Sequence, residues 1–144
     1  MLDLLQSVEM FEGLNERQLR RLAELFREQT LEPGQTLFSR GDEANRLFLV
    51  KAGFLAVVVP GDEAGEERTI VHLGHGQSVG EMSLVECGTR SATVRALTPG
   101  TVVACASIPS IRQLCERCPK LGYRILNNIA ADLSFRLRRH TEES

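Results

Sequence analysis

One stretch of the sequence carries most of its information, and it reads Val79-Gly80-Glu81-Met82-Ser83-Leu84-Val85-Glu86-Cys87-Gly88-Thr89-Arg90-Ser91-Ala92-Thr93-Val94. Its second half predicts a strand that begins with an arginine. With the strand period of two, Arg90 shares one face with Ala92, Val94 and Ala96. This face is small and apolar, so we expect it to point into the body of the domain. A guanidinium keeps its charge when buried, and its burial is costly unless an anion meets it.

The first half of the stretch offers groups that attract an anion. Gly80 and Glu81 precede one helical turn over residues 82–85. The first N–H groups of such a turn have no partner within it, and glycine lets the backbone come close to a ligand. An inward Arg90 opposite these amides predicts a phosphate pocket. The Glu81 carboxylate only accepts hydrogen bonds and suits sugar hydroxyls, so the two halves together indicate a nucleotide.

The stretch resembles the phosphate-binding cassette of cyclic-nucleotide-binding domains, where Gly-Glu-aliphatic-small-Leu is followed, after a short loop, by Arg-small-Ala-Thr-Val. This chain has the two motifs at residues 80–84 and 90–94. Its Val79 departs from the family's usual aromatic residue, which changes packing rather than a ligand contact. The resemblance implies that Glu81 holds the ribose 2′-hydroxyl and that Arg90 holds the cyclic phosphate. The ligand-binding residues it implies are Gly80, Glu81, Met82, Ser83, Arg90 and Ser91, with backbone amides from Met82 and Ser83.

Length and composition fit one domain spanning residues 1–144. The chain is 42% hydrophobic and 25% charged, which is ordinary for a globular domain. Its formal net charge of −2 gives no general attraction to DNA or to an acidic membrane. No apolar run approaches the roughly 20 residues that span a bilayer, and the N-terminus lacks a signal-peptide pattern. The four cysteines form no disulfide framework, so we expect a cytoplasmic protein.

Turn residues divide the chain into helical flanks and a strand-rich centre. We expect N-terminal helices over residues 1–29, where Asn15 is a helix N-cap and Gln18 its capping-box partner. Residues 30–108 show short strands between Gly and Pro turns, which indicates a β-sandwich or barrel. Residues 109–144 are helical again, and Pro119 suits the first position of a longer helix. The expected strands are 35–38, 46–51, 54–59, 68–73, 90–96 and 101–108.

The resemblance covers almost the whole chain and implies a double-stranded β-helix, or jelly roll, with N-terminal helices and a long C-terminal helix. The cassette then occupies residues 79–94 of the jelly roll. An apolar stripe on the long helix predicts packing within the chain, whereas in the family the corresponding helix commonly mediates dimerisation or closes over the base. A homodimer through this helix therefore stays open. The stripe consists of Leu121, Ile125, Ile129, Leu133 and Leu137, joined by Leu126 and Ala130.

By the same resemblance the protein is a sensor rather than an enzyme, and its ligand is a cyclic nucleoside monophosphate. Ser91 resembles the family's transcription activators, whereas a threonine at this place accompanies cGMP preference in its kinases, so the resemblance favours cAMP over cGMP. The base contacts of the family's transcription activators do not carry over, because their places hold Asp132, Arg136 and Leu137. No DNA-binding, kinase, channel or cyclase domain is expected in this chain. The occupied state would therefore pass to a second subunit or an unknown effector protein, or to another part of a longer protein.

Two other functions stay open at this point. One is a jelly-roll interaction module that has lost nucleotide binding, with Arg90 and Glu81 paired to each other. The other is a metal-dependent enzyme of the cupin type, because His72, His75 and Glu81 are a set that can hold iron or manganese. The second cupin histidine motif is absent, and the cysteine pair at residues 115–118 lacks a second pair for zinc. We therefore expect no metal and no cofactor besides the nucleotide ligand.

Overall fold

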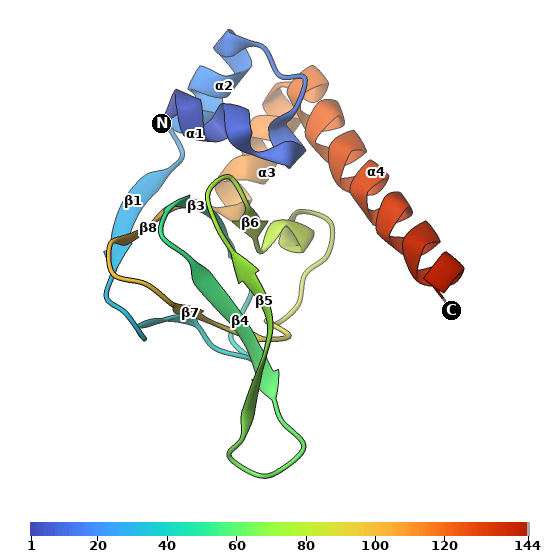
Figure 1. The fold of residues 1–144 in the computed structure, drawn as a ribbon. Helices are drawn as coiled ribbons and strands as arrows, with labels where there is room; N and C mark the ends of the chain where they lie inside the picture. The colour runs from blue at the N-terminus through green and yellow to red at the C-terminus, as the bar shows by residue number, and fades with distance from the viewer. Residues whose placement is uncertain (144) are drawn as a thin grey trace.

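Two antiparallel sheets form the centre of the computed structural model, which describes residues 1–143 and their side chains as far as Thr141 (Figure 1). The first sheet has the strand order β1-β8-β3-β6 and the second has the order β2-β7-β4-β5. Apart from the hairpin of β4 and β5, neighbours within a sheet are distant in sequence because the chain crosses between the sheets. This is the predicted jelly roll, which is confirmed. The strands are β1 (Arg27–Leu31), β2 (Thr36–Phe38), β3 (Arg46–Ala52), β4 (Leu55–Pro60), β5 (Glu67–Leu73), β6 (Ser78–Val79), β7 (Thr93–Ala96) and β8 (Thr101–Ser107).

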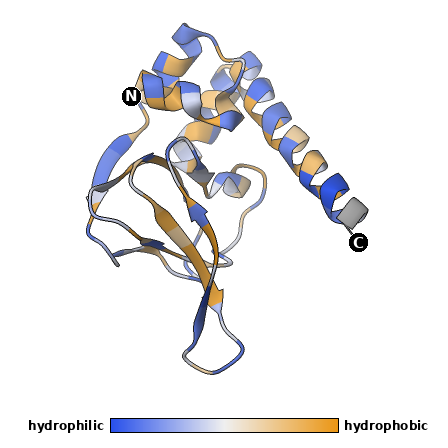
Figure 2. Ribbon diagram, viewed as in Figure 1, coloured by the Kyte–Doolittle hydropathy of each residue, from blue (hydrophilic) through white to orange (hydrophobic). Residues whose placement is uncertain are grey.

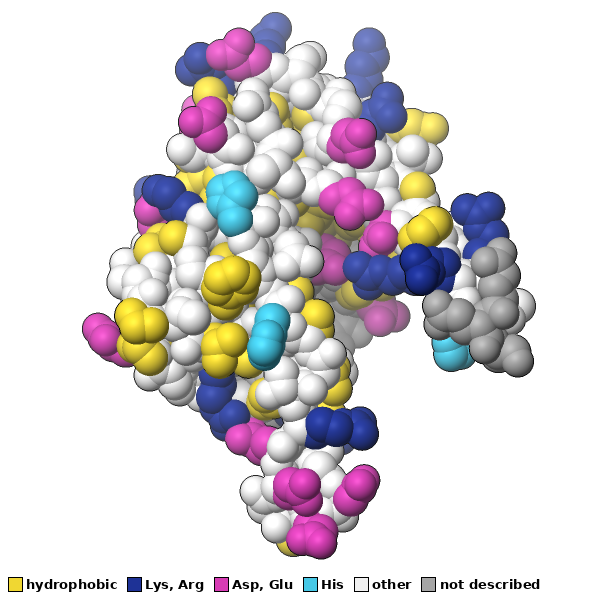
Figure 3. Space-filling view, viewed as in Figure 1, with side chains coloured by type: hydrophobic (Ala, Val, Ile, Leu, Met, Phe, Trp, Pro, Cys, Tyr) yellow, Lys and Arg dark blue, Asp and Glu magenta, His cyan; other side chains and the backbone are white. Residues whose placement is uncertain are grey.

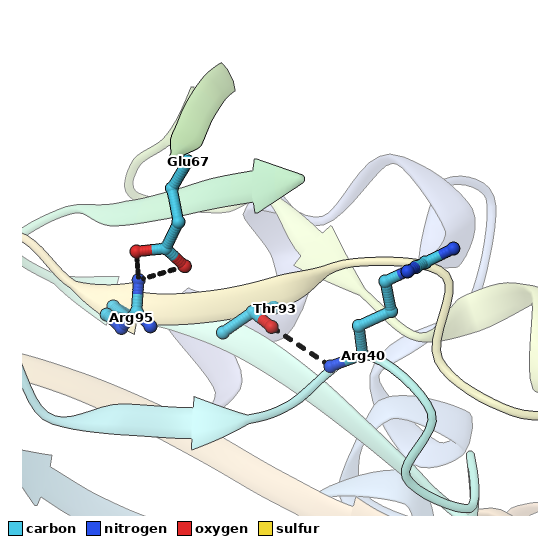
Figure 4. Close-up of polar contacts among 4 residues, drawn as sticks. All are labelled: Arg40, Glu67, Thr93 and Arg95. Atoms are coloured by element: carbon cyan, nitrogen blue, oxygen red, sulfur yellow. Dashed lines mark hydrogen bonds and ion pairs between the residues drawn. The ribbon is translucent and has the colours of Figure 1, made fainter. Parts of the chain in front are cut away.

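Strand β7 carries the predicted inward face. Val94 is 1% exposed and packs in the apolar cluster between the sheets. Its neighbours face outward, where Arg95 Nη1 lies 2.7 Å from Glu67 Oε1, and Thr93 Oγ1 accepts a bond of 3.0 Å from the amide of Arg40 (Figure 4). Figure 2 shows that the neighbouring hairpin of β4 and β5 is mostly hydrophobic along β4 and more hydrophilic toward its tip. Strand β7 therefore has side-chain contacts on both of its faces.

The N-terminal helices cover one end of the roll and close a second apolar cluster (Figure 1). They are α1 (Leu2–Ser7), the 3₁₀ helix η1 (Glu9–Phe11) and α2 (Glu16–Ala23). The predicted capping box is confirmed. Asn15 Oδ1 accepts from the amide of Gln18 at 2.8 Å, and the amide of Asn15 donates to Gln18 Oε1 at 2.9 Å. Two backbone donors at the start of α2 are thereby satisfied.

The expected boundary between the N-terminal helices and the strands, at residue 29, does not match the structure. The helices end at Ala23 and the strand begins at Arg27, so that boundary falls inside a strand. Of the residues in β1, only Leu31 is buried, and no alternation of apolar and polar residues marks it in the sequence. Its register is set by β8, from Arg27 opposite Cys105 to Leu31 opposite Thr101.

The C-terminal helices begin directly after β8. Helix α3 (Ile108–Arg117) is followed by Cys118 and then by α4 (Pro119–Glu143), with the proline at the first helical position as predicted. None of the helices that the structure describes has the length and apolar character needed to cross a bilayer.

The apolar stripe of α4 packs against the body only in the first half of the helix. Leu121 and Ile125 are 0% exposed and Ile129 is 5% exposed. Leu133 and Leu137 are 38% and 67% exposed, so the prediction that they pack within the chain is wrong. The reason is visible in Figure 1, where the C-terminal half of α4 extends past the N-terminal helices that cover its first half.

Replacing Ile125 tests the packing of α4. The change Ile125→Ala is expected to lower the free energy of unfolding by about 2–5 kcal/mol, because it leaves a cavity in a closed core. The matched change Leu137→Ala removes an exposed side chain, and its expected effect is within about 0.5 kcal/mol. Urea titration of dilute, monomeric protein measures both. Equal effects of the two changes would contradict the packing described here.

Candidate ligand-binding site

The cassette joins β6 to β7 through one tight turn and one loop. Gly80 follows β6 with φ of +95°, a left-handed conformation that favours glycine, and caps the 3₁₀ helix η2 (Glu81–Leu84). The loop then runs to Thr89, which forms an isolated bridge with Glu43. Strand β7 begins only at Thr93, three residues later than expected.

Arg90 is therefore fixed by a neighbouring turn rather than by a strand ladder. Its amide donates to the carbonyl of Asp42 at 2.7 Å, and its own carbonyl accepts from the amide of Gly41 at 2.8 Å. The predicted inward direction is nevertheless confirmed, since Arg90 is 7% exposed. These two backbone bonds could not be predicted from the sequence, because they depend on a turn that lies far from Arg90 along the chain.

The guanidinium of Arg90 is only partly satisfied by the protein. It lies over the ring of Phe38, 4.1 Å from the centroid, and Nη2 donates to the carbonyl of Arg46 at 2.7 Å. Nε is buried and has no hydrogen-bond partner among the residues described. Burial lowers the pKa of Arg90 from its ordinary value, opposed chiefly by Asp42, and an arginine stays protonated in such a setting. A buried cation with an unused donor suits an anion.

A cavity of about 320 Å³ lies beside this guanidinium. Within the described chain no acceptor is bonded to the amides of Glu81 and Met82, the first two of η2, whereas the amide of Ser83 donates to the carbonyl of Gly80 at 3.2 Å. Glu86 also lines the cavity. Five of the six expected ligand-binding residues line this cavity, namely Gly80, Met82, Ser83, Arg90 and Ser91.

The sixth expected residue, Glu81, faces a neighbouring cavity. This second space of about 270 Å³ lies between the β5–β6 turn, η1 and α4, and Asp132 and Arg136 line it together with Glu81. Figure 3 shows acidic and basic side chains gathered in the hollow between the roll and α4. Glu81 Oε2 lies 3.5 Å from Ser78 Oγ, and none of the ion pairs found in the described residues joins Glu81 to Arg90.

The residues considered for a metal site do not gather. Nδ1 of His75 lies 2.8 Å from the carbonyl of Lys51. Across the described residues, no three His, Cys, Asp or Glu side chains are placed to hold an ion. Cys115 and Cys118 are free thiols, and burial raises the pKa of Cys115. Arg21 Nη1 lies 2.8 Å from Cys118 Sγ.

Comparison with known proteins points to one family. The family model described as Cyclic nucleotide-binding domain matches residues 28–118. The "cAMP-activated global transcriptional regulator CRP" of Salmonella typhimurium is 36% identical over 99 residues, which is 68% of this chain and 46% of that protein. The "cAMP-dependent protein kinase type II regulatory subunit" of Drosophila melanogaster is 27% identical over 131 residues, 91% of this chain and 34% of that subunit. The chain thus spans less than half of either relative.

Two solved structures of similar proteins match the fold of this chain over almost its whole length. The N-terminal domain of a transcriptional regulator from Streptomyces coelicolor matches with a TM-score of 0.83 and 27% identity, over 98% of this chain and 94% of that one. The Catabolite Activator Protein of Thermus thermophilus matches with a TM-score of 0.79 and 30% identity, over 94% and 61% of the two chains.

Replacing Gly80 tests how closely the cassette surrounds Arg90. A Cβ at this position would lie 2.6 Å from Arg90 Nη1 and 2.7 Å from the carbonyl of Arg46. The change Gly80→Ala is therefore expected to lower the free energy of unfolding by about 1–3 kcal/mol, through strain at positive φ and displacement of the guanidinium. Gly88→Ala in the same loop is the control, because a Cβ there meets nothing within 4 Å. Indistinguishable urea midpoints for the two variants would refute this arrangement.

Proposed function

Because this chain belongs to the cyclic nucleotide-binding domain family, we propose that it is a cytoplasmic sensor for a cyclic nucleoside monophosphate, with cAMP preferred over cGMP. Domains of this family and fold are regulatory rather than catalytic. The observation that supports the proposal is the buried Arg90, whose Nε has no hydrogen-bond partner among the described residues and whose guanidinium lies at a cavity. We take residues 1–144 as one such domain, with residues 79–94 as its cassette.

The phosphate would bind in the cavity beside Arg90. The planar guanidinium can donate two parallel bonds to phosphate oxygens, which makes this the strongest contact of the site. Free amides at Glu81 and Met82 add donors at the start of η2. Ser83 and Ser91 line the same cavity, and the hydroxyl of Ser91 can donate to a phosphate oxygen. Together these groups would neutralise and surround one phosphate.

The sugar and base would extend toward α4. Glu81 lies at the second cavity, where its carboxylate can accept from the ribose 2′-hydroxyl. Asp132 and Arg136 line that space from α4 and are 2.9 Å apart. The Asp132 carboxylate can accept a hydrogen bond from an amino group on either purine base, so this contact fits cAMP and cGMP alike. The preference for cAMP is supported by the relatives whose names include cAMP.

The exposed apolar face of α4 would carry the signal to a second copy of the chain. Its exposed residues recur at spacings of three and four, which is the seam of a two-stranded coiled coil. A homodimer through this seam would bury apolar surface that one chain leaves in solvent. We place any further effector outside residues 1–144. The seam consists of Tyr123, Leu126, Ala130, Leu133 and Leu137.

Isothermal titration tests ligand binding. We expect heat from cAMP, a smaller response from cGMP and none from linear AMP. Arg90→Ala is expected to weaken cAMP binding by about 100-fold or more, because the phosphate loses a buried charged partner. Arg90→Lys is expected to fail as well, since an ammonium lacks the planar fork, and Glu81→Ala to lose about tenfold.

Arg95→Ala is the matched control for these variants. Arg95 is an arginine near Arg90 but faces outward and pairs with Glu67, so its removal should leave cAMP affinity within about twofold. A wild-type protein that gives no heat and no thermal stabilisation with either cyclic nucleotide would overturn the proposal. That outcome would favour an interaction module without nucleotide binding.

Sedimentation equilibrium tests the dimer. The wild type is expected to sediment as a dimer, and Leu133→Asp as a monomer, because the change places a charge in the apolar seam. Ser134→Asp serves as control, since Ser134 is exposed next to Leu133 but lies outside the seam. A monomeric wild type at high concentration, with and without cAMP, would exclude an interface on α4.

A further inference from the structure

Helix α3 contacts the cassette through Arg112. Its Nη2 donates to the carbonyl of Ser83 at 2.8 Å, in a partly buried bond. Its Nη1 lies 3.9 Å from Cys87 Sγ, in the loop that follows η2. Arg112 is not among the described residues that line either cavity. One arginine from outside the site therefore holds the turn that borders it.

The geometry of a helical turn gives this contact a direction. The N–H groups of a turn point toward its start and its carbonyls toward its end, and the last carbonyls have no partner within the turn. In η2 the free amides of Glu81 and Met82 stand at the start, and Arg112 bonds the Ser83 carbonyl near the end. A cation fixed at the carbonyl end thus sets where the amide end points.

Apolar packing alone does not fix the orientation of η2. Leu84 of η2 lies in the same apolar cluster as Ile108 and Ile111 of α3 and Leu121 of α4. Apolar contacts are non-directional, so this packing keeps the three elements together without fixing the rotation of the turn. The bond from Arg112 to Ser83 supplies the missing orientation, because a hydrogen bond weakens steeply as it is bent.

From this geometry we propose that Arg112 is a positioning residue for nucleotide binding. It orients η2 so that the amides of Glu81 and Met82 face the phosphate, and it connects the turn to α3. Helix α3 shares an apolar cluster with the first turns of α4 through Ile111 and Leu121, so the bond from Arg112 also connects the turn to α4. This inference rests on the proposed function, and it names the polar link between the cassette and the C-terminal helices.

The test combines cAMP titration with hydrogen exchange. Arg112→Ala is expected to weaken cAMP binding by about tenfold, because one charge-assisted bond is lost. Arg112→Lys keeps a donor and should recover most of that loss. At saturating cAMP, exchange along α4 should respond in the wild type and in Arg112→Lys but not in Arg112→Ala. Arg117→Ala, an exposed arginine on the same helix, should behave as the wild type.

A second readout needs no ligand. In the unliganded protein, Arg112→Ala should speed exchange of the amides of Ser83, Val85 and Glu86 by about threefold or more, because these amides donate to carbonyls of the turn and the turn is freed locally. Unchanged exchange in η2 would overturn the positioning role whether or not cAMP binds. Unchanged cAMP affinity and an unchanged α4 response would overturn the link while leaving the sensor function intact. A wild type that binds no cAMP would overturn the sensor function instead.

Discussion

The burial of the Arg90 guanidinium constrains the rest of the structure. The group keeps its charge in the interior, so the chain must surround it with compensating contacts. Phe38 supplies a ring face and Arg46 a carbonyl, from two different sheets. Gly80 must lack a side chain, because a Cβ there would collide with the guanidinium. Nε has no hydrogen-bond partner among the described residues, and this unused donor makes the neighbouring cavity suitable for an anion.

Much of the fold could be predicted because period and turn residues are local signals. The inward face of β7, the capping box at Asn15 and the jelly roll were all predicted and are confirmed. Strand β1 could not be predicted, since only Leu31 is buried and its pairing with β8 comes from far along the chain. The apolar stripe on α4 was predicted to pack within the chain as far as Leu137, but its last residues are exposed. A helical period of 3.6 does not distinguish a face buried in the core from an apolar face on the surface.

The candidate site, like the fold, could be predicted from the sequence only in part. The family resemblance predicted which residues would form the ligand site, and five of the six, Arg90 among them, line one cavity. It did not predict that Glu81 faces the other cavity, because the turn after Gly80 rotates the side chain toward α4. The contacts of Arg112 and the carbonyl of Arg46 were also missed. A backbone carbonyl leaves no mark in a sequence, and an arginine on a helix is most often a solvated one.

The position of Arg90 also bears on how fast the site can exchange its ligand. The contacts of the Arg90 guanidinium with Phe38 and with the carbonyl of Arg46 are made within the protein itself, so they order the side chain independently of a ligand. A group that is already ordered loses little entropy when it binds. Association with such a site does not wait for a side chain to find its place, so differences in affinity between ligands fall on how long each one stays. In a sensor built this way, the residence time of the nucleotide sets the duration of the signal.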